Sequence, residues 1–261
     1  MTRQSSKHKK NPSRPPRFGI ARTLSKLGYC SRSEAADLVR SGRVTLNGTT
    51  LRDPEHPVPP GQNRIEVDGQ FVAAAKKIYI ALNKPRGLVS TASDEKGRDT
   101  IYSCLPKDLP WVGPVGRLDQ ASEGLLLLTN DSEWAARITA PETHLDKTYH
   151  VRVGGVVDDR VLASLTEGIQ SDGELLRAKS AHVVRGGGRR CWIEIILDEG
   201  KNRHIRRMFE AVGIEVLRLI RIAIGPLTLG NLPKGDWRSL TPEEKKDLDS
   251  AMKKAGGGAS R

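Results

Sequence analysis

The sequence contains little cysteine and no long apolar run. Its 261 residues include three cysteines, Cys30, Cys104 and Cys191, which lie far apart and form no Cys-x-x-Cys pair. This number and spacing exclude a disulfide framework and a cysteine-based zinc site. No window reaches the length of a membrane span, and the first residues lack the apolar core of a signal peptide. We therefore expect a cytoplasmic protein without a membrane partner.

Motifs for metals and nucleotide cofactors are missing as well. The sequence has no glycine-rich nucleotide loop. His144 and His150 have no second ligand at a spacing typical of metal sites. We therefore expect neither a metal nor a cofactor.

Acidic residues are outnumbered, since 43 Lys and Arg face 31 Asp and Glu, and the formal net charge is +12. Such an excess favours a partner that carries phosphates, although a role in solubility or binding to an anionic membrane surface would also require it. Residues 1–17 contain three prolines and no acidic residue. We expect this segment to be a disordered basic arm.

Residues 18–69 have the pattern helix, turn, helix, hairpin. Ile20, Leu24 and Leu27 recur at helical spacing, and Gly28 follows in the position of a C-terminal cap. Ser31 to Glu34 has the form of a capping box, which predicts a second helix that ends at Gly42. Asn47-Gly48 predicts a hairpin turn, and residues 65–69 a closing strand. Five basic residues lie between the apolar positions and could form an RNA-binding face or a salt-bridged surface: Arg22, Lys26, Arg32, Arg40 and Arg43.

This segment resembles the S4 RNA-binding domain, especially in residues 26–35 and 42–48. The resemblance implies that it binds structured RNA. Residues 70–77 are interpreted as a linker. After them, a buried-strand run at residues 78–82 leads into the basic turn Asn83–Gly87, where Lys84 and Arg86 suit a phosphate contact.

The stretch Val115–Asp131 places Asp119 on a short polar turn before the leucines at 125–128, which have the length of a fully buried strand. Three roles for Asp119 remain open from these residues. It could form a glycosidase carboxylate pair with Glu123. It could form a structural salt bridge with Arg117. It could also be a lone carboxylate nucleophile that a guanidinium keeps ionised.

Two later segments could supply partners for this turn. Residues 147–153 alternate as a strand, with Tyr149 and Val151 on one face and His150 and Arg152 on the other. Tyr149 could stack on a base or pack in the core. Residues 199–210 form a turn and a helix with four cations, Lys201, Arg203, Arg206 and Arg207, whose density at a helix start favours an anionic partner. Two strands, at 177–184 and 191–197, are predicted around a basic loop at 185–190 that could reach a phosphate backbone.

Taken together, the motifs at residues 116–131, 147–149, 199–208 and 224–227 resemble those of RNA pseudouridine synthases, in the branch that carries an S4 domain and modifies ribosomal RNA. The resemblance implies that Asp119 is the nucleophile, that Tyr149 stacks on a flipped base, and that Arg206 pairs with the catalytic carboxylate. Arg117 is then expected to orient the turn or contact RNA. Two residues depart from the family pattern: Ser122 replaces a usual threonine, and His204 a usual Gln or Glu.

The resemblance also implies an α+β fold. We expect a small S4 domain and a larger catalytic domain over residues 78–250, with a mostly antiparallel mixed sheet and helices to one side, followed by a disordered tail at 251–261. The expected function is isomerisation of a specific uridine in 23S ribosomal RNA to pseudouridine. We expect the protein to act as a monomer, and its partner to be ribosomal RNA or a ribosome assembly intermediate. A 16S enzyme and a non-catalytic RNA-binding assembly protein are the alternatives. Besides the S4 cations, the expected RNA contacts are Lys84, Arg86, Arg117, Lys147, Lys201, Arg203 and Arg207.

Overall fold

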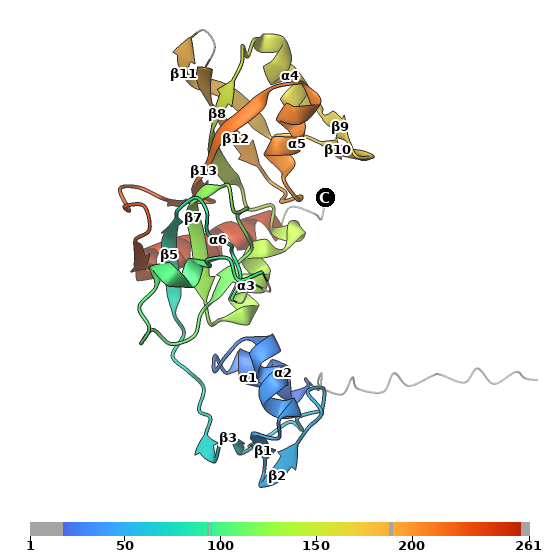
Figure 1. The fold of residues 1–261 in the computed structure, drawn as a ribbon, viewed down its shortest axis with the longest axis vertical. Coiled ribbons are helices and arrows are strands. Elements are labelled where there is room, and N and C mark those ends of the chain that lie inside the picture. Colours follow the sequence, from blue (N-terminus) through green and yellow to red (C-terminus); the bar gives the residue numbers. More distant parts are fainter. Residues whose placement is uncertain (1–17, 93, 95, 188–189, 257–261) are drawn as a thin grey trace, which may run out of the picture. The chain divides into compact units, whose positions relative to one another are not determined.

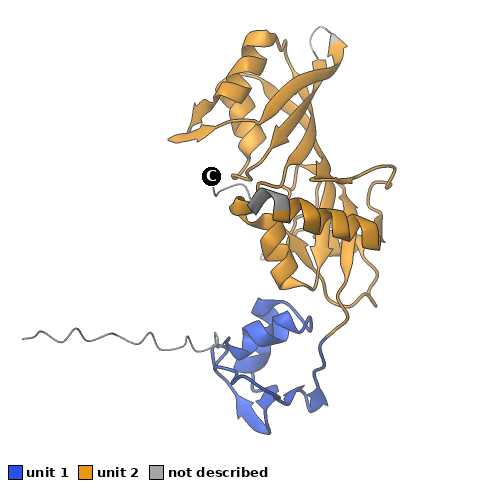
Figure 2. Ribbon diagram, turned by 180° about the vertical axis from the view of Figure 1, so that it is seen from behind, with its two compact units in different colours: residues 1–74 blue, residues 75–261 orange. Residues whose placement is uncertain are grey.

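The computed structural model describes residues 18–256 except 93, 95, 188 and 189. It divides into two compact units, residues 1–74 and 75–261 (Figure 2), which we describe separately. The predicted arm at 1–17 lies outside the described residues, as do residues 257–261 of the predicted tail. No helix in the described part of the chain is both long and apolar enough to cross a lipid bilayer.

The first unit has the predicted order of two helices and a small sheet (Figure 1). Its elements are α1 (Ile20–Lys26), α2 (Arg32–Arg40), β1 (Val44–Leu46), β2 (Thr49–Leu51), β3 (Ile65–Val67) and β4 (Gln70–Phe71), with strand order β2-β1-β3-β4. The Ser31 hydroxyl accepts from the Glu34 amide, as the capping box predicts. Asn47 and Gly48 both have positive φ, which confirms the hairpin turn.

The linker prediction at 70–77 is partly wrong. Residues 70 and 71 form β4, which pairs with β3, and Val72 is buried in the core of the first unit. The boundary between the units falls after Ala74. A strand of two residues is too short for an alternating apolar pattern, so the sequence alone could not predict it.

The second unit is built on a sheet with the path β11-β12-β8-β13-β7-β5-β15, with β6 paired to β7 and β14 paired to β13. All its pairs are antiparallel except β13 with β7, which confirms a mostly antiparallel mixed sheet. The strands are β5 (Tyr79–Lys84), β6 (Gly113–Val115), β7 (Glu123–Thr129), β8 (Lys147–Gly154), β11 (Ser180–Gly187), β12 (Arg190–Leu197), β13 (Glu215–Ile224), β14 (Leu227–Thr228) and β15 (Trp237–Ser239). A separate hairpin joins β9 (Ile169–Ser171) and β10 (Glu174–Leu176).

Helices cover both faces of this sheet, so the expectation that they lie to one side is wrong. The helical elements are η1 (Ile101–Cys104), α3 (Ser132–Thr139), η2 (Pro141–Thr143), α4 (Asp159–Glu167), α5 (His204–Ala211) and α6 (Pro242–Gly256). Leu125 and Leu127 of β7 pack with α3 and α6, whereas Val151 and Leu219 pack with α4 and α5. The strand register places these two pairs on opposite faces. A sequence pattern does not reveal which face of a sheet a helix returns to.

Strand β7 is buried along its whole length, as the leucine run predicts. Leu126 and Leu128 pack on the face opposite to Leu125 and Leu127, against residues of η1 and the loop before β7. Gly124 has a φ of +102°, and a Cβ there would lie 2.2 Å from the Arg221 carbonyl oxygen. Strands β7 and β13 can therefore approach this closely only because residue 124 is glycine.

The C-terminal helix α6 extends into the predicted disordered tail. Thr241 and Glu244 exchange side-chain to backbone hydrogen bonds at its start, in the form of a capping box. Because α6 continues to Gly256, residues 251–256 are helical and the predicted tail boundary at 251 is wrong.

Candidate active site

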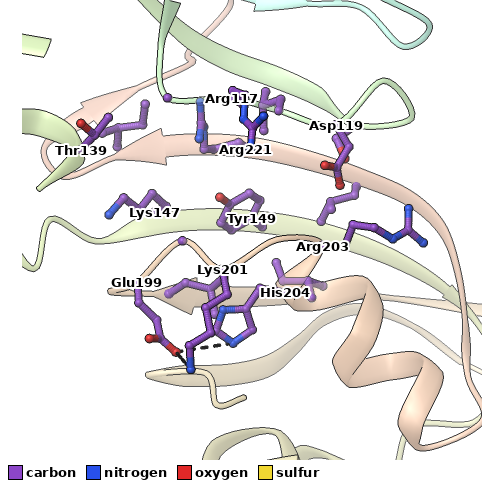
Figure 3. Close-up of a pocket in the computed structure, with 18 of the residues that line it drawn as sticks. Arg117, Asp119, Thr139, Lys147, Tyr149, Glu199, Lys201, Arg203, His204 and Arg221 are labelled. Atoms are coloured by element: carbon purple, nitrogen blue, oxygen red, sulfur yellow. Dashed lines mark ion pairs between the residues drawn. The ribbon is translucent and has the colours of Figure 1, made fainter. Parts of the chain in front are cut away.

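A cavity of about 420 Å³ lies beside the turn between β6 and β7. This volume suits a small ligand such as a single nucleobase with its sugar. Figure 3 shows the residues that line it: Arg117 and Asp119 of the turn, Lys147 and Tyr149 of β8, Arg221 of β13, and Arg203 and His204 at the start of α5. Asp119 and Tyr149, predicted to act together, thus border one cavity.

The turn that carries Asp119 is held in place through its backbone carbonyl oxygens. Every carbonyl oxygen from Leu118 to Ser122 accepts a hydrogen bond. The donors are the Ser90 hydroxyl for residue 118, the Lys84 ammonium for residues 119 and 122, the Gly87 amide for residue 120 and the Arg206 guanidinium for residue 121. A turn fixed at successive residues holds its side chain in a defined direction, which positions a reacting group before substrate binds.

Lys84 is the central donor to this turn. Its side chain is fully buried, and Nζ lies 3.2, 3.1 and 2.9 Å from the carbonyl oxygens of Pro85, Asp119 and Ser122. Burial lowers the pKa of Lys84 to about 8, although the carboxylates of Asp119 and Glu123 oppose this shift. The prediction that Lys84 contacts RNA is wrong, because its ammonium is enclosed by backbone acceptors.

The Asp119 carboxylate faces the cavity (Figure 3). It forms no hydrogen bond or ion pair with a described residue, and Arg117, its neighbour in the sequence, is exposed at the cavity rim. A structural salt bridge between these two side chains is therefore not formed. The carboxylate is left available for a ligand.

Arg206 lies behind the same turn. Its Nη2 donates to the Ala121 carbonyl oxygen at 3.1 Å and its Nη1 to the Val216 carbonyl oxygen at 3.4 Å, while Nε is buried without a partner in the described structure. Burial lowers the pKa of Arg206, and the nearby Asp119 carboxylate opposes that shift. No ion pair joins the two side chains among the described residues. The Arg206 side chain thus contacts the backbone of the turn that carries Asp119.

Glu123 cannot act as a second catalytic carboxylate. It is buried, accepts two hydrogen bonds from Arg218 at 2.8 and 3.0 Å, and pairs with Lys234 at 2.5 Å. Burial alone would raise its pKa, but the Arg218 and Lys234 contacts outweigh that effect and lower it to about 2. A glycosidase pair of Asp119 and Glu123 is excluded, because both carboxyl groups of such a pair must face the scissile bond, whereas Glu123 does not line the cavity and its oxygens are held by Arg218 and Lys234.

Arg221 is a cavity residue that the sequence analysis did not single out. It is buried, its Nε donates to the Leu125 carbonyl oxygen at 2.7 Å, and its Nη2 is buried without a partner within the described residues. Burial, and then the Arg221 charge, lower the pKa of Lys147. Along β13, Arg221 lies two residues from the buried Leu219 and two from the buried Ala223, and it is buried with them. An arginine on the apolar face of a strand was the signal that could have identified it.

His204 opens α5 and is buried at the cavity wall. Neither ring nitrogen has a hydrogen-bond partner in the described part of the chain, although Nε2 lies 3.9 Å from a Glu199 oxygen. Burial lowers the pKa of His204, and the neighbouring Glu199 carboxylate opposes the shift. Burial thus favours the neutral ring, which has one donor and one acceptor nitrogen.

The other cations of this region divide into two groups. Arg203 is exposed, and it lines both this cavity and a second one of about 540 Å³ to which Arg86, Arg98 and Arg117 also contribute. Lys201 pairs with Glu199 and donates to the Leu175 carbonyl oxygen. Arg207 is mostly buried, in contact with Asp172, Glu174 and the Ser171 carbonyl oxygen, so the prediction that it contacts RNA is wrong.

The basic residues predicted in the first unit lie on its surface. Arg32, Arg40 and Arg43 form exposed ion pairs with Glu55, Asp37 and Asp68. Arg22 and Lys26 lie over the Phe18 ring at 4.5 and 3.8 Å from its centroid. Exposed pairs of this kind contribute little stability, so the salt-bridged surface does not prevent these cations from binding phosphates. Among the described residues, no cluster of three or more His, Cys, Asp or Glu is arranged to hold a metal ion.

Comparison with known proteins adds two family matches. Residues 78–211 match the family model described as RNA pseudouridylate synthase, and residues 19–63 match the S4 domain. The chain is 40% identical over 235 residues to an uncharacterized RNA pseudouridine synthase of Aquifex aeolicus, covering 89% of this chain and 94% of that protein.

Two further relatives have more specific names. The chain is 38% identical to ribosomal large subunit pseudouridine synthase B of Bacillus subtilis, over 88% of this chain and 94% of that protein. Identity to the protein of the same name from Escherichia coli K12 is 36%, over 85% and 78%. A crystal structure of a pseudouridylate synthase superimposes with a TM-score of 0.63 at 30% identity, over 88% of this chain and 99% of the other.

Proposed function

This chain belongs to the RNA pseudouridine synthase family, and on that premise we propose that it isomerises a uridine of ribosomal RNA with Asp119 as the nucleophile. The observation that supports this role is the contrast between the two carboxylates beside the turn. Glu123 is buried in ion pairs, whereas the Asp119 carboxylate faces the cavity unpaired while its backbone is fixed. A reacting carboxylate needs a rigid mount and a free oxygen.

The reaction requires no added atoms. The Asp119 carboxylate attacks C1′ of the uridine, the C1′–N1 bond breaks, and the uracil leaves with the electron pair on N1. The uracil turns within the cavity, C5 attacks C1′, and the carboxylate is released. C5 then loses a proton and N1 gains one, so the product is an isomer of the substrate.

The cavity wall suits the charge that this sequence creates. The departing uracil carries negative charge on N1 and on its carbonyl oxygens, and Lys147 and Arg221 are the cationic groups of the β8 and β13 wall. Preorganised donors at such a position stabilise charge that develops only during the reaction. Tyr149, on the same strand as Lys147, offers a ring on which the flipped base can stack.

Arg86, Arg117 and Arg203 border the second cavity together with Asp119. We assign these arginines to the phosphates on either side of the flipped nucleotide. Flipping a base from a stack costs on the order of a few kcal/mol, and phosphate contacts offset that cost. The S4 domain supplies further contacts to structured RNA.

We also propose that the substrate is 23S ribosomal RNA, because relatives from Bacillus subtilis and Escherichia coli K12 are named ribosomal large subunit pseudouridine synthase B and are matched over 94% and 78% of their length. We also propose that the protein acts as a monomer. The substrate could be naked RNA or a ribosome assembly intermediate, and the activity on each is to be measured.

The test is to incubate the protein with unmodified 23S and 16S transcripts and to map pseudouridine at nucleotide resolution. Wild-type protein is expected to modify 23S RNA, and Asp119→Asn to bind the RNA with no pseudouridine formed. Asp108→Asn, at an exposed position, is the matched control and should act as wild type.

Each other outcome has a definite meaning. Modification of 16S RNA alone would overturn the large-subunit assignment. Full activity of Asp119→Asn would overturn the nucleophile. Tight RNA binding by wild-type protein without any product, on either transcript or on assembly intermediates, would favour a non-catalytic assembly role.

A further inference from the structure

Three arginines and a tryptophan form one row across four strands of the catalytic unit. Cross-strand pairing aligns Arg185 of β11 with Trp192 of β12, Trp192 with Arg152 of β8, and Arg152 with Arg218 of β13. Adjacent strands lie about 4.8 Å apart, so this row spans roughly 14 Å. Residues paired across strands project from the same face, so the four side chains share one surface.

This surface lies on the face of the sheet opposite to Tyr149. Tyr149 and Val151 alternate with Arg152 along β8, and Val151 is buried in the core cluster that includes α5 residues. Figure 1 shows α4 and α5 together on one side of the upper strands. Arg185 is exposed, and Arg152, Trp192 and Arg218 are half-buried. The arginine row is thus separate from the catalytic cavity.

The charges of the row are largely unneutralised. Within the described structure, Arg152 and Arg185 form no ion pair, and Arg218 shares Glu123 with Lys234. The guanidinium carbons of Arg185 and Arg218 lie 5.6 and 6.0 Å from the Trp192 ring centroid.

The flanking rows do not reverse this charge. On one side, Glu194 lies between His150 and His182, with contacts of 3.1 and 3.6 Å. On the other side, the register places Arg190 and Glu215 opposite Gly154. One carboxylate in each flanking row leaves the surface around Trp192 positive.

We propose that the arginine row binds a single-stranded segment of RNA away from the flipped uridine. The ligand class rests on the proposed function, and the location rests on the row itself. Cations that flank an aromatic ring suit a strand whose phosphates contact the guanidinium groups and whose base stacks on the ring. Lysines anywhere on the surface could bind phosphates alone. The central tryptophan, by contrast, suits a ligand with planar bases.

The experiment uses the full chain and fluorescent oligoadenylate, which contains no uridine and so cannot be a substrate. Binding is measured against salt for wild type, for Arg152→Ala with Arg185→Ala, and for Trp192→Ala. The matched control is Lys107→Ala with Arg160→Ala, which removes two exposed cations elsewhere in the same unit. Thermal unfolding confirms that each variant is folded.

We expect the double arginine variant to lower the slope of log K against log salt by about 1.4, because each phosphate contact on a single strand contributes about 0.7. Trp192→Ala should weaken binding between about fivefold and about 150-fold, since stacking contributes about 1–3 kcal/mol per base. The control variant Lys107→Ala with Arg160→Ala should lose less oligoadenylate affinity than the double arginine variant. Pseudouridine formation on a short hairpin that fills only the cavity should keep its kcat in all these variants.

Unchanged oligoadenylate affinity and slope in the arginine and tryptophan variants would overturn the proposal. The proposal would also be overturned if these variants lost affinity only for polyglutamate, an acidic polypeptide, and not for oligoadenylate. The row would then be assigned to a protein partner. If the hairpin is not modified while the row still binds oligoadenylate, the proposed function fails and this inference stands.

Discussion

The Lys84 ammonium lies 3.1 Å from the carbonyl oxygen of Asp119 and 2.9 Å from that of Ser122. A buried cation is normally costly, and here three backbone oxygens surround it. The contact holds the backbone of the turn that carries Asp119 and leaves the Asp119 side chain free. With Asp119 as the proposed nucleophile, Lys84 is a positioning residue that would act on the reaction through the turn.

Replacing Lys84 with methionine should loosen this turn. We expect a drop of about 2–4 kcal/mol in the free energy of unfolding, because buried carbonyl oxygens lose their donor. We also expect kcat to fall about a hundredfold, since a displacement near 1 Å is enough for such a loss. Denaturant unfolding and single-turnover kinetics measure the two effects. Lys107→Met, at an exposed site, should change neither.

The same lysine predicts a pH dependence. Its folded pKa is about 8 against 10.5 for the ordinary group, so between these values the unfolded chain binds more protons. Stability contributed by this residue therefore rises with pH across that window. Activity should fall over the same window, because a neutral amine has two N–H groups for three acceptors. If wild type and Lys84→Met have parallel stability curves from pH 8 to 10.5, the shifted pKa is refuted.

Gly124 should tolerate no side chain. A Cβ there would meet the Arg221 carbonyl oxygen at 2.2 Å, whereas one at Gly87, which has the same φ of +102°, would meet nothing within 4 Å. Gly87→Ala should cost about 1–2 kcal/mol of stability from backbone strain. Gly124→Ala should cost at least about 3 kcal/mol, because the clash of β7 with β13 adds to the strain. Equal losses in thermal unfolding would contradict the clash.

Glu123→Gln should reduce stability and leave the chemistry intact. The partners Arg218 and Lys234 are partly exposed, so we expect a loss of about 1–3 kcal/mol at pH 7. The folded pKa of Glu123 is about 2 against 4.5 for the ordinary group. Its contribution is therefore present above pH 4.5 and is lost as pH falls through about 2. At a temperature where the variant is folded, kcat should match that of the exposed control Glu142→Gln; a loss of several orders of magnitude would reinstate Glu123 as a catalytic group.

His204 should make the protein less stable in mild acid. Its folded pKa is below the ordinary value of 6.5, so below pH 6.5 the unfolded chain takes up a proton first. The free energy of unfolding therefore falls as pH decreases through this region. His204→Gln should flatten the curve below pH 6.5, the ordinary pKa of the group. An unchanged curve in that variant, followed by calorimetry, would show that another group titrates.

Local signals in the sequence were sufficient for much of the fold. The Ser31 cap and the Asn47-Gly48 turn depend on neighbouring residues only, and the structure contains both. The leucines of β7 form a buried strand for the same reason. The motif that carries Asp119 was also recognisable, because its residues are contiguous.

Long-range contacts decided the rest. Lys84 and Arg207 read as exposed cations, yet Lys84 is enclosed by carbonyl oxygens near residue 119 and Arg207 by residues of the β9–β10 hairpin. Arg221 and the arginine row become visible only when β8, β12 and β13 are in register.

By itself, the sequence determined the two domains, the family and the residue that faces the cavity. The tertiary structure determined which charges are free to meet RNA. The physical reason is that helix caps and turns are specified by neighbouring residues, whereas the partner of a charged side chain is set by strand pairing between segments up to about a hundred residues apart, such as Glu123 and Arg218.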